Sequence, residues 1–155
     1  MYFHYGDPVS IHTLVAAAYN VVRDVNTKRG GSLMMMKDML FDQVKPEMHS
    51  EFRALINKSE NFFKHADRDH DSTLDFNPDE TDLFIFDACS KYWELSGENP
   101  PLVQIYRGWF MVTHAYLFKL TAEMSQQMSK AKGATEGGRT SYFNLMLPLV
   151  MKSGV

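Results

Sequence analysis

The chain has 155 residues, of which 45% are apolar, 13% aromatic and 23% charged, and its formal net charge is −3. This composition predicts one folded domain over residues 1–155 and excludes a disordered chain. The Lys and Arg residues are scattered and form no basic stripe that could follow a phosphate backbone, so we expect no DNA partner.

Three features of the sequence bear on the compartment. Cys89 is the only cysteine and cannot form an internal disulfide, which favours a reducing environment. The apolar runs are too short for a membrane-spanning helix, and residues 1–8 lack the basic and apolar regions of a secretion signal. We therefore expect a cytoplasmic protein that does not bind membranes.

Apolar residues at helical spacing predict an all-α protein, an antiparallel bundle of about five helices plus a short C-terminal helical segment. Residues 1–9 are expected to form an N-terminal arm, and the first helix is expected from Ser10 to about Lys28. The second helix, rich in methionine, is expected from Ser32 to about Val44. The remaining predicted elements are a third helix over 46–65, a fourth over 77–96, a long fifth over 100–132, and a flexible connector with a C-terminal segment over 133–155.

The densest group of potential metal ligands lies in the polar stretch after the third helix. Residues 67–87 carry eight acidic side chains and one basic side chain. The first three aspartates, Asp67, Asp69 and Asp71, are spaced like the first ligands of a calcium-binding loop. Ser72 stands where such a loop has glycine, and its final carboxylate is missing. A divalent metal held by His65, Asp67, Asp69 and Asp71 is therefore one interpretation, and a solvated loop whose aspartates cap turns is the other.

Two histidines are candidates for a ligand pocket. His65 ends the third helix after two phenylalanines, and His12 lies on the apolar stripe of the first helix. Facing helices of a bundle can bring such side chains together, which would place His12 opposite His65, Asp67 and Asp69. The alternative is that each imidazole is a structural side chain that bonds to a neighbouring polar group.

Arg107 and His114 are separated by six residues on the predicted fifth helix. This spacing resembles the Arg-x(4-6)-His element of HEPN-type ribonucleases, which are also helical and which cleave RNA with such residues from two subunits. Gly108 follows Arg107, where that family usually has a polar side chain. The alternative interpretation pairs the arginine with an acidic neighbour and places the histidine in a helix interface.

Two sequence blocks carry a second resemblance. The blocks Ile11-His12-Thr13-Leu14 and Asn61-Phe62-Phe63-Lys64-His65-Ala66-Asp67-Arg68-Asp69 resemble those of a family of short uncharacterised bacterial proteins, over residues 11–95. The resemblance implies no activity, but it adds weight to His12, His65, Asp67 and Asp69 as one site.

Together these patterns favour a binding protein with a His/Asp pocket for a metal ion or a small polar ligand. The alternatives are a HEPN-like ribonuclease and an interaction module without catalysis. We also expect a homodimer, formed through the methionine-rich second helix or the long fifth helix.

Overall fold

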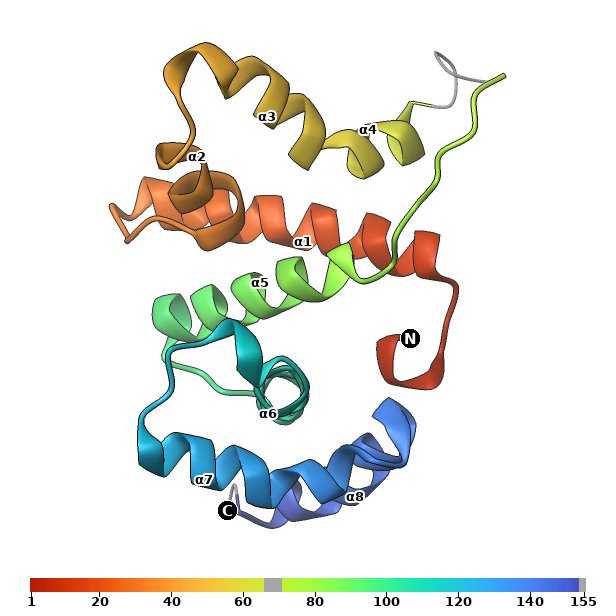
Figure 1. Cartoon of the computed structure of the whole chain (residues 1–155), viewed down its shortest axis with the longest axis vertical. Coiled ribbons are helices and arrows are strands. Elements are labelled where there is room, and N and C mark those ends of the chain that lie inside the picture. Colours follow the sequence, from red (N-terminus) through yellow and green to blue (C-terminus); the bar gives the residue numbers. More distant parts are fainter. Residues whose placement is uncertain (66–70, 154–155) are drawn as a thin grey trace. The chain divides into compact units, whose positions relative to one another are not determined.

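The computed structural model describes residues 1–65 and 71–153 (Figure 1). Every regular element in these two ranges is a helix, which confirms the all-α prediction. No helix in the described part of the chain has the length and apolar composition that crossing a bilayer requires. The chain divides into two compact units: Met1–Gly6 with Gly97–Val155 forms unit 1, and Asp7–Ser96 forms unit 2.

Unit 2 is built on α1 (Pro8–Lys28), which begins two residues before the predicted start. Asp7 is the N-cap, because its carboxylate accepts a hydrogen bond of 2.7 Å from the backbone N–H of Ser10, and Pro8 fits the first helical position. The helix ends before Gly30, whose φ of +66° suits glycine. The first helix is therefore the element that the sequence predicted best.

α5 (Glu80–Ser96) packs along α1, and the two helices run in the same direction (Figure 1). His12 contacts Thr81 near both N-terminal ends, and Arg29 donates to the carbonyl of Leu95 near both C-terminal ends. This pair is parallel rather than antiparallel because the connection between the two helices is long and contains helices of its own. Tyr19 of α1 and Phe84 of α5 are buried together with Met34 and Met36 in the core of unit 2.

The segment after α1 is less regular than the predicted second helix. It forms a π-helical turn, η2 (Met35–Met39), followed by one α-helical turn, α2 (Leu40–Asp42). We call residues 33–42 the methionine segment. A π-turn within a helical sequence is a frequent feature of functional sites, because it turns side chains away from their regular positions.

The predicted third helix is broken into three pieces, η3 (Pro46–Met48), α3 (His49–Ile56) and α4 (Lys58–Lys64). The break between α3 and α4 lies at Asn57, whose side-chain amide donates to the carbonyl of Arg53 and so competes with regular helix geometry. In Figure 1, α3 and α4 lie on one side of α1, and α5 lies on the other.

Unit 1 contains the second half of the helices. In chain order these are η1 (Tyr2–His4), α6 (Pro101–Thr113), η4 (Ala115–Leu117), α7 (Ala122–Ala131), η5 (Lys132–Thr135) and α8 (Gly138–Ser153). The predicted long fifth helix over 100–132 is therefore wrong. It is interrupted because Phe118 is extended and Thr121 caps a new helix, with its hydroxyl accepting from the N–H of Met124.

The ends of the chain are also more ordered than predicted. Residues 133–155 were expected to be a connector and a short segment, but α8 alone has 16 residues and continues through Pro148. In the expected N-terminal arm, Phe3 is buried and stacks on Phe143 with a centroid distance of 4.9 Å. Thr140 donates a hydrogen bond to the carbonyl of Phe3. Aromatic packing within unit 1 thus fixes both segments.

Candidate functional site

A cavity of about 370 Å³ opens in unit 2 between α1, the methionine segment, α3 and α4. Its walls carry three cationic and three anionic side chains together with amides and apolar groups. We call it the charged pocket, and its lining residues are Asn20, Arg23, Leu33, Lys37, Asp38, Phe41, Asp42, Arg53, Ile56, Asn57 and Glu60.

A buried ion pair forms one wall of the charged pocket. Nζ of Lys37 donates to Oε2 of Glu60 over 2.8 Å and to Oδ1 of Asn20 over 3.0 Å. The second carboxylate oxygen of Glu60 accepts from Asn20 over 2.7 Å and from Lys64 over 2.6 Å. Burial acts to raise the pKa of Glu60, but the hydrogen bonds and charges of the two lysines outweigh it and lower that pKa. Glu60 is therefore a carboxylate at neutral pH.

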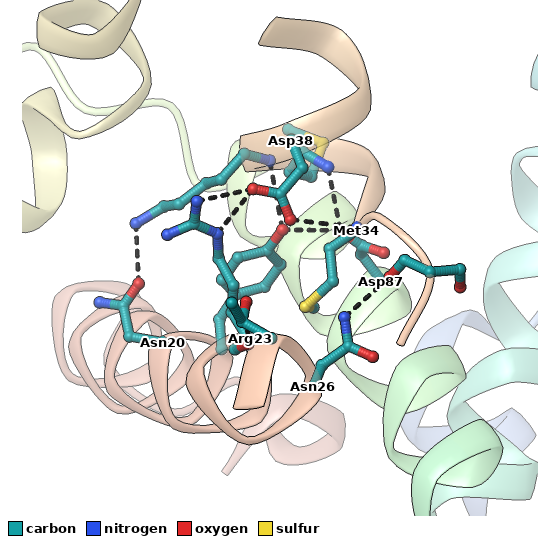
Figure 2. Close-up of polar contacts among 11 residues, drawn as sticks. Asn20, Arg23, Asn26, Met34, Asp38 and Asp87 are labelled. Carbon is teal, nitrogen blue, oxygen red and sulfur yellow. Dashed lines mark hydrogen bonds and ion pairs between the residues drawn. The ribbon is translucent and has the colours of Figure 1, made fainter. Parts of the chain in front are cut away.

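A second ion pair joins α1 to the methionine segment. Nε and Nη2 of Arg23 lie 2.8 and 2.6 Å from Oδ1 of Asp38. Oδ2 of Asp38 accepts from the backbone N–H of Met34 over 3.1 Å, so this carboxylate also satisfies an amide at the start of the π-turn. Figure 2 shows Asp38 between the guanidinium of Arg23 and the backbone of Met34. The Asp38 carboxylate thus holds the methionine segment, which lines the charged pocket, against α1.

Hydrogen bonds from the core hold the other face of the methionine segment. Oδ2 of Asp87 accepts from the hydroxyl of Tyr19 over 2.8 Å and from the N–H of Met36 over 2.9 Å. The hydroxyl of Tyr19 accepts in turn from the N–H of Lys37 over 3.2 Å. Burial and the neighbouring Asp87 carboxylate raise the pKa of Tyr19, so the phenol stays protonated. The backbone that carries Lys37 and Asp38 is therefore anchored to both α1 and α5.

The outer part of the charged pocket combines apolar and charged groups. The guanidinium of Arg53 lies over the ring of Phe41, 5.0 Å from its centroid, which is a cation–π arrangement. Leu33 and Ile56 supply the aliphatic surface, and Asp42 is exposed at the methionine segment's end. The pocket can therefore contact both the apolar and the polar parts of a ligand.

His12, a predicted ligand residue, is buried beside this region. Its Nδ1 is 3.0 Å from the hydroxyl oxygen of Thr81, and the rings of Phe63, Phe76 and Phe84 surround the imidazole at 5.1–6.1 Å. Burial lowers the pKa of His12, so its ring is neutral at neutral pH. This arrangement matches the structural alternative for His12.

Of the other predicted ligands, the structure describes His65 and Asp71. His65 is the C-cap of α4 and is half-buried, and its backbone N–H donates to the carbonyl of Asn61. Phe63 of α4 contacts the His12 ring, with a centroid distance of 5.8 Å. Asp67 and Asp69 lie outside the described residues, and Asp71 is exposed.

No group of three or more His, Cys, Asp or Glu side chains within residues 1–65 and 71–153 is placed to hold a metal ion. Because two of the four predicted ligands lie outside these ranges, the metal site stays a prediction.

The residues of the ribonuclease alternative lie in unit 1. Arg107 is in α6, and His114 is the C-cap of this helix. The His114 ring stacks on Phe110 with a centroid distance of 4.3 Å, and Nδ1 lies 2.9 Å from the hydroxyl oxygen of Thr113. These contacts agree with a histidine packed at a helix end, and RNA cleavage stays a prediction.

The sequence contains a signal for the charged pocket that belongs to no known motif. Lys37 and Asp38 are the only charged residues in the run from Leu33 to Phe41. Charged side chains within so apolar a segment are seldom buried unless they have partners, so they predict ion pairs to other helices. The partners Arg23 and Glu60 carry no comparable signal, because charged residues are common on helix surfaces.

Comparisons of the chain with protein-family models, with curated proteins and with solved structures found no match.

Proposed function

We propose that the protein binds a small polar ligand in the charged pocket, within the cytoplasm. The observation that carries this proposal is the cavity of about 370 Å³ whose inner wall is a buried ion pair, Lys37 with Glu60. A volume of this size falls within the usual range for small-molecule sites, which combine apolar walls with a few fixed polar groups.

The energetics of the ion pair support a functional role. A buried ion pair gives little net stability, because the loss of hydration offsets most of the attraction, and apolar residues of similar volume often stabilise a fold equally well. Charged groups that neighbouring hydrogen bonds hold in place can instead meet a ligand without rearrangement. Lys37 and Asp38 are held in this way by Tyr19, Asn20 and Arg23.

A methyl-detected NMR titration tests the proposal. The probes are benzoate, benzamide, benzylamine, glycine and glycerol, and the readout is the methyl resonance of Ile56 in the pocket wall. We expect at least one probe to shift this resonance saturably while the methyl groups of Leu145, in unit 1, stay in place. If none of the five probes shifts Ile56, the proposed function is wrong.

Two tryptophan substitutions supply a matched control. Leu33 lines the charged pocket, and Leu55 is exposed on α3 outside its lining. Leu33→Trp is expected to fill the cavity and abolish the ligand-induced shift of Ile56, whereas Leu55→Trp is expected to leave it unchanged. If the ligand-induced shift of Ile56 were the same in both variants, the ligand would bind outside the charged pocket and the proposal would be wrong.

The homodimer is proposed on a separate observation. Two apolar side chains of the methionine segment that lie outside the lining of the charged pocket, Met39 and Leu40, are 52% and 40% exposed. Burying such side chains against a second copy would be favourable. Light scattering after size exclusion measures the mass directly: about twice 17.8 kDa supports the dimer. A monomeric mass at high micromolar concentration would contradict it.

A further inference from the structure

The charges around the charged pocket indicate what kind of ligand it takes. We propose that this pocket selects a small organic monoanion, whose carboxylate is bound by Arg53 and Arg23. The apolar part of the ligand lies against Leu33, Phe41 and Ile56. This inference rests on the proposed function, and it adds the charge and the chemical class of the ligand.

The buried carboxylates of the pocket are already occupied. Each of them accepts three hydrogen bonds, and both oxygens of each are engaged. Glu60 accepts from Lys37, Lys64 and Asn20. Asp38 accepts from Nε and Nη2 of Arg23 and from the N–H of Met34. A carboxylate has about four acceptor sites, so little capacity is left for a cationic ligand.

The donors, in contrast, have spare capacity. Arg23 directs Nε and Nη2 to Asp38, which leaves Nη1 for another acceptor. Arg53 lies over Phe41, and no carboxylate of the described ranges is within ion-pair distance of it. A guanidinium has five N–H donors in one plane, a geometry that matches a carboxylate. Both arginines line the same cavity.

The local charge also favours a single negative charge on the ligand. The pocket and its ion-pair network contain four cations, Arg23, Lys37, Arg53 and Lys64, and three carboxylates, Asp38, Asp42 and Glu60. The net charge of this group is therefore +1. A monoanion would neutralise it, whereas a dianion would leave an excess of negative charge beside Asp42.

The apolar lining of the cavity favours an organic acid over an inorganic ion as the ligand. Leu33, Phe41 and Ile56 provide an apolar surface that a hydrated inorganic anion would not use. The contact with the face of the Phe41 ring also restricts the Arg53 guanidinium, which reduces the entropy lost when a carboxylate binds. The ligand is thus expected to have one carboxylate and a compact apolar body.

Matched probes test this inference at neutral pH. Benzoate, benzamide and benzylamine share a ring and differ in charge, while phthalate adds a second carboxylate and inorganic phosphate lacks the apolar body. We expect benzoate to bind at least about tenfold more tightly than each of the others, as measured by the Ile56 methyl shift. Benzamide, benzylamine, phthalate or phosphate binding as tightly as benzoate would overturn the inference and leave the proposed function standing. If no probe of this set shifts Ile56, the inference fails, and if glycine and glycerol also leave Ile56 unshifted, the proposed function fails with it.

Two charge variants test the role of Arg53. Arg53→Gln is expected to weaken benzoate binding about tenfold, the loss of one charge-assisted contact, and to leave benzamide binding unchanged. Lys58→Gln is the control, because Lys58 is exposed at the start of α4 and outside the lining, and its loss changes the net charge equally. Equal weakening by both variants would show a long-range charge effect and would overturn the role of Arg53. The comparison of benzoate with benzamide on the unaltered protein does not depend on either variant.

Discussion

Lys37 and Glu60 form an ion pair of 2.8 Å in which both side chains are about nine-tenths buried, with 9% and 10% of their surfaces exposed. The pair joins the methionine segment to α4, and both elements line the charged pocket. The two partners are not equivalent. Glu60 has a second cation, Lys64, whereas Lys37 has no other carboxylate within ion-pair distance in the described ranges.

This asymmetry predicts unequal effects of removing each partner. Glu60→Leu leaves a buried ammonium without its carboxylate and is expected to lower the free energy of unfolding by about 3–5 kcal/mol. Lys37→Met leaves Glu60 with Lys64 and Asn20, so the expected loss is about 1–3 kcal/mol. Urea denaturation followed by circular dichroism measures both changes.

A third variant checks the explanation. In the double variant Lys37→Met with Glu60→Leu neither charge of this pair remains, and the variant is expected to be more stable than Glu60→Leu alone. If Lys37→Met were the more damaging single change, the asymmetry argued from Lys64 would be incorrect.

The parts of unit 2 that the sequence predicted are those with local causes. Asp7 and Pro8 start α1 two residues before the predicted Ser10, and Asn77, where the fourth helix was predicted to begin, accepts from the N–H of Asp79 in the turn before α5. Such interactions lie within a few residues of one another, so they are visible in the sequence. The parallel direction of α1 and α5 has no local cause, because it depends on contacts between residues such as Tyr19 and Asp87.

The candidate site was predicted less well than the fold because it also depends on contacts between residues that are distant in the sequence. The predicted metal ligands lie within residues 65–71, where ligand-type side chains are close together in the sequence. The charged pocket instead combines eleven residues from separate segments of the chain, and only Lys37 and Asp38 stand out from their neighbours in the sequence. The break of the predicted helix over 100–132 also shows that apolar periodicity continues across a loop that interrupts the helix.

Tyr19 is predicted to stabilise unit 2 through its hydroxyl. Tyr19→Phe removes the donor to Asp87 and the acceptor for the N–H of Lys37, both in a buried region. The expected loss in the free energy of unfolding is about 1–3 kcal/mol, because two buried polar groups lose a partner. Tyr116→Phe is the control, since Tyr116 is 79% exposed, and it is expected to change stability by less than about 0.5 kcal/mol. Similar effects of the two variants would argue against the hydrogen-bond network.

Gly31 is predicted to be required for the turn that leads into the methionine segment. A Cβ at this position would overlap the side chain of Asn26, which is buried and donates to the carbonyl of Ser32 over 2.7 Å. Gly31→Ala should therefore displace Asn26 and lower the free energy of unfolding by about 1–3 kcal/mol. Gly133→Ala is the control because a Cβ there meets no atom within 4 Å, and a melting temperature at or above that of the parent is expected. An unchanged melting temperature for Gly31→Ala would contradict the predicted overlap.

His12 is predicted to make the stability of unit 2 depend on pH. Burial lowers its pKa below the ordinary value of 6.5, and the nearby Lys37 acts in the same direction against the opposing effect of Glu80 and Glu60. The unfolded chain therefore binds a proton at this residue before the folded chain does. The free energy of unfolding is then constant above about pH 6.5 and falls as the pH decreases from there towards the lowered pKa, by at most about 1.4 kcal/mol per pH unit.

Urea denaturation at about pH 7.5 and about pH 5.5 measures this effect. Glu60 does not contribute to the difference, because the stability that its charge provides is lost only below its unfolded pKa of 4.5. His12→Gln is expected to lower the stability at both pH values and to remove most of the difference between them. His49→Gln, which changes a half-buried histidine bonded to the carbonyl of Val44, should keep the difference. A pH dependence that survives in His12→Gln would show that another group is its source.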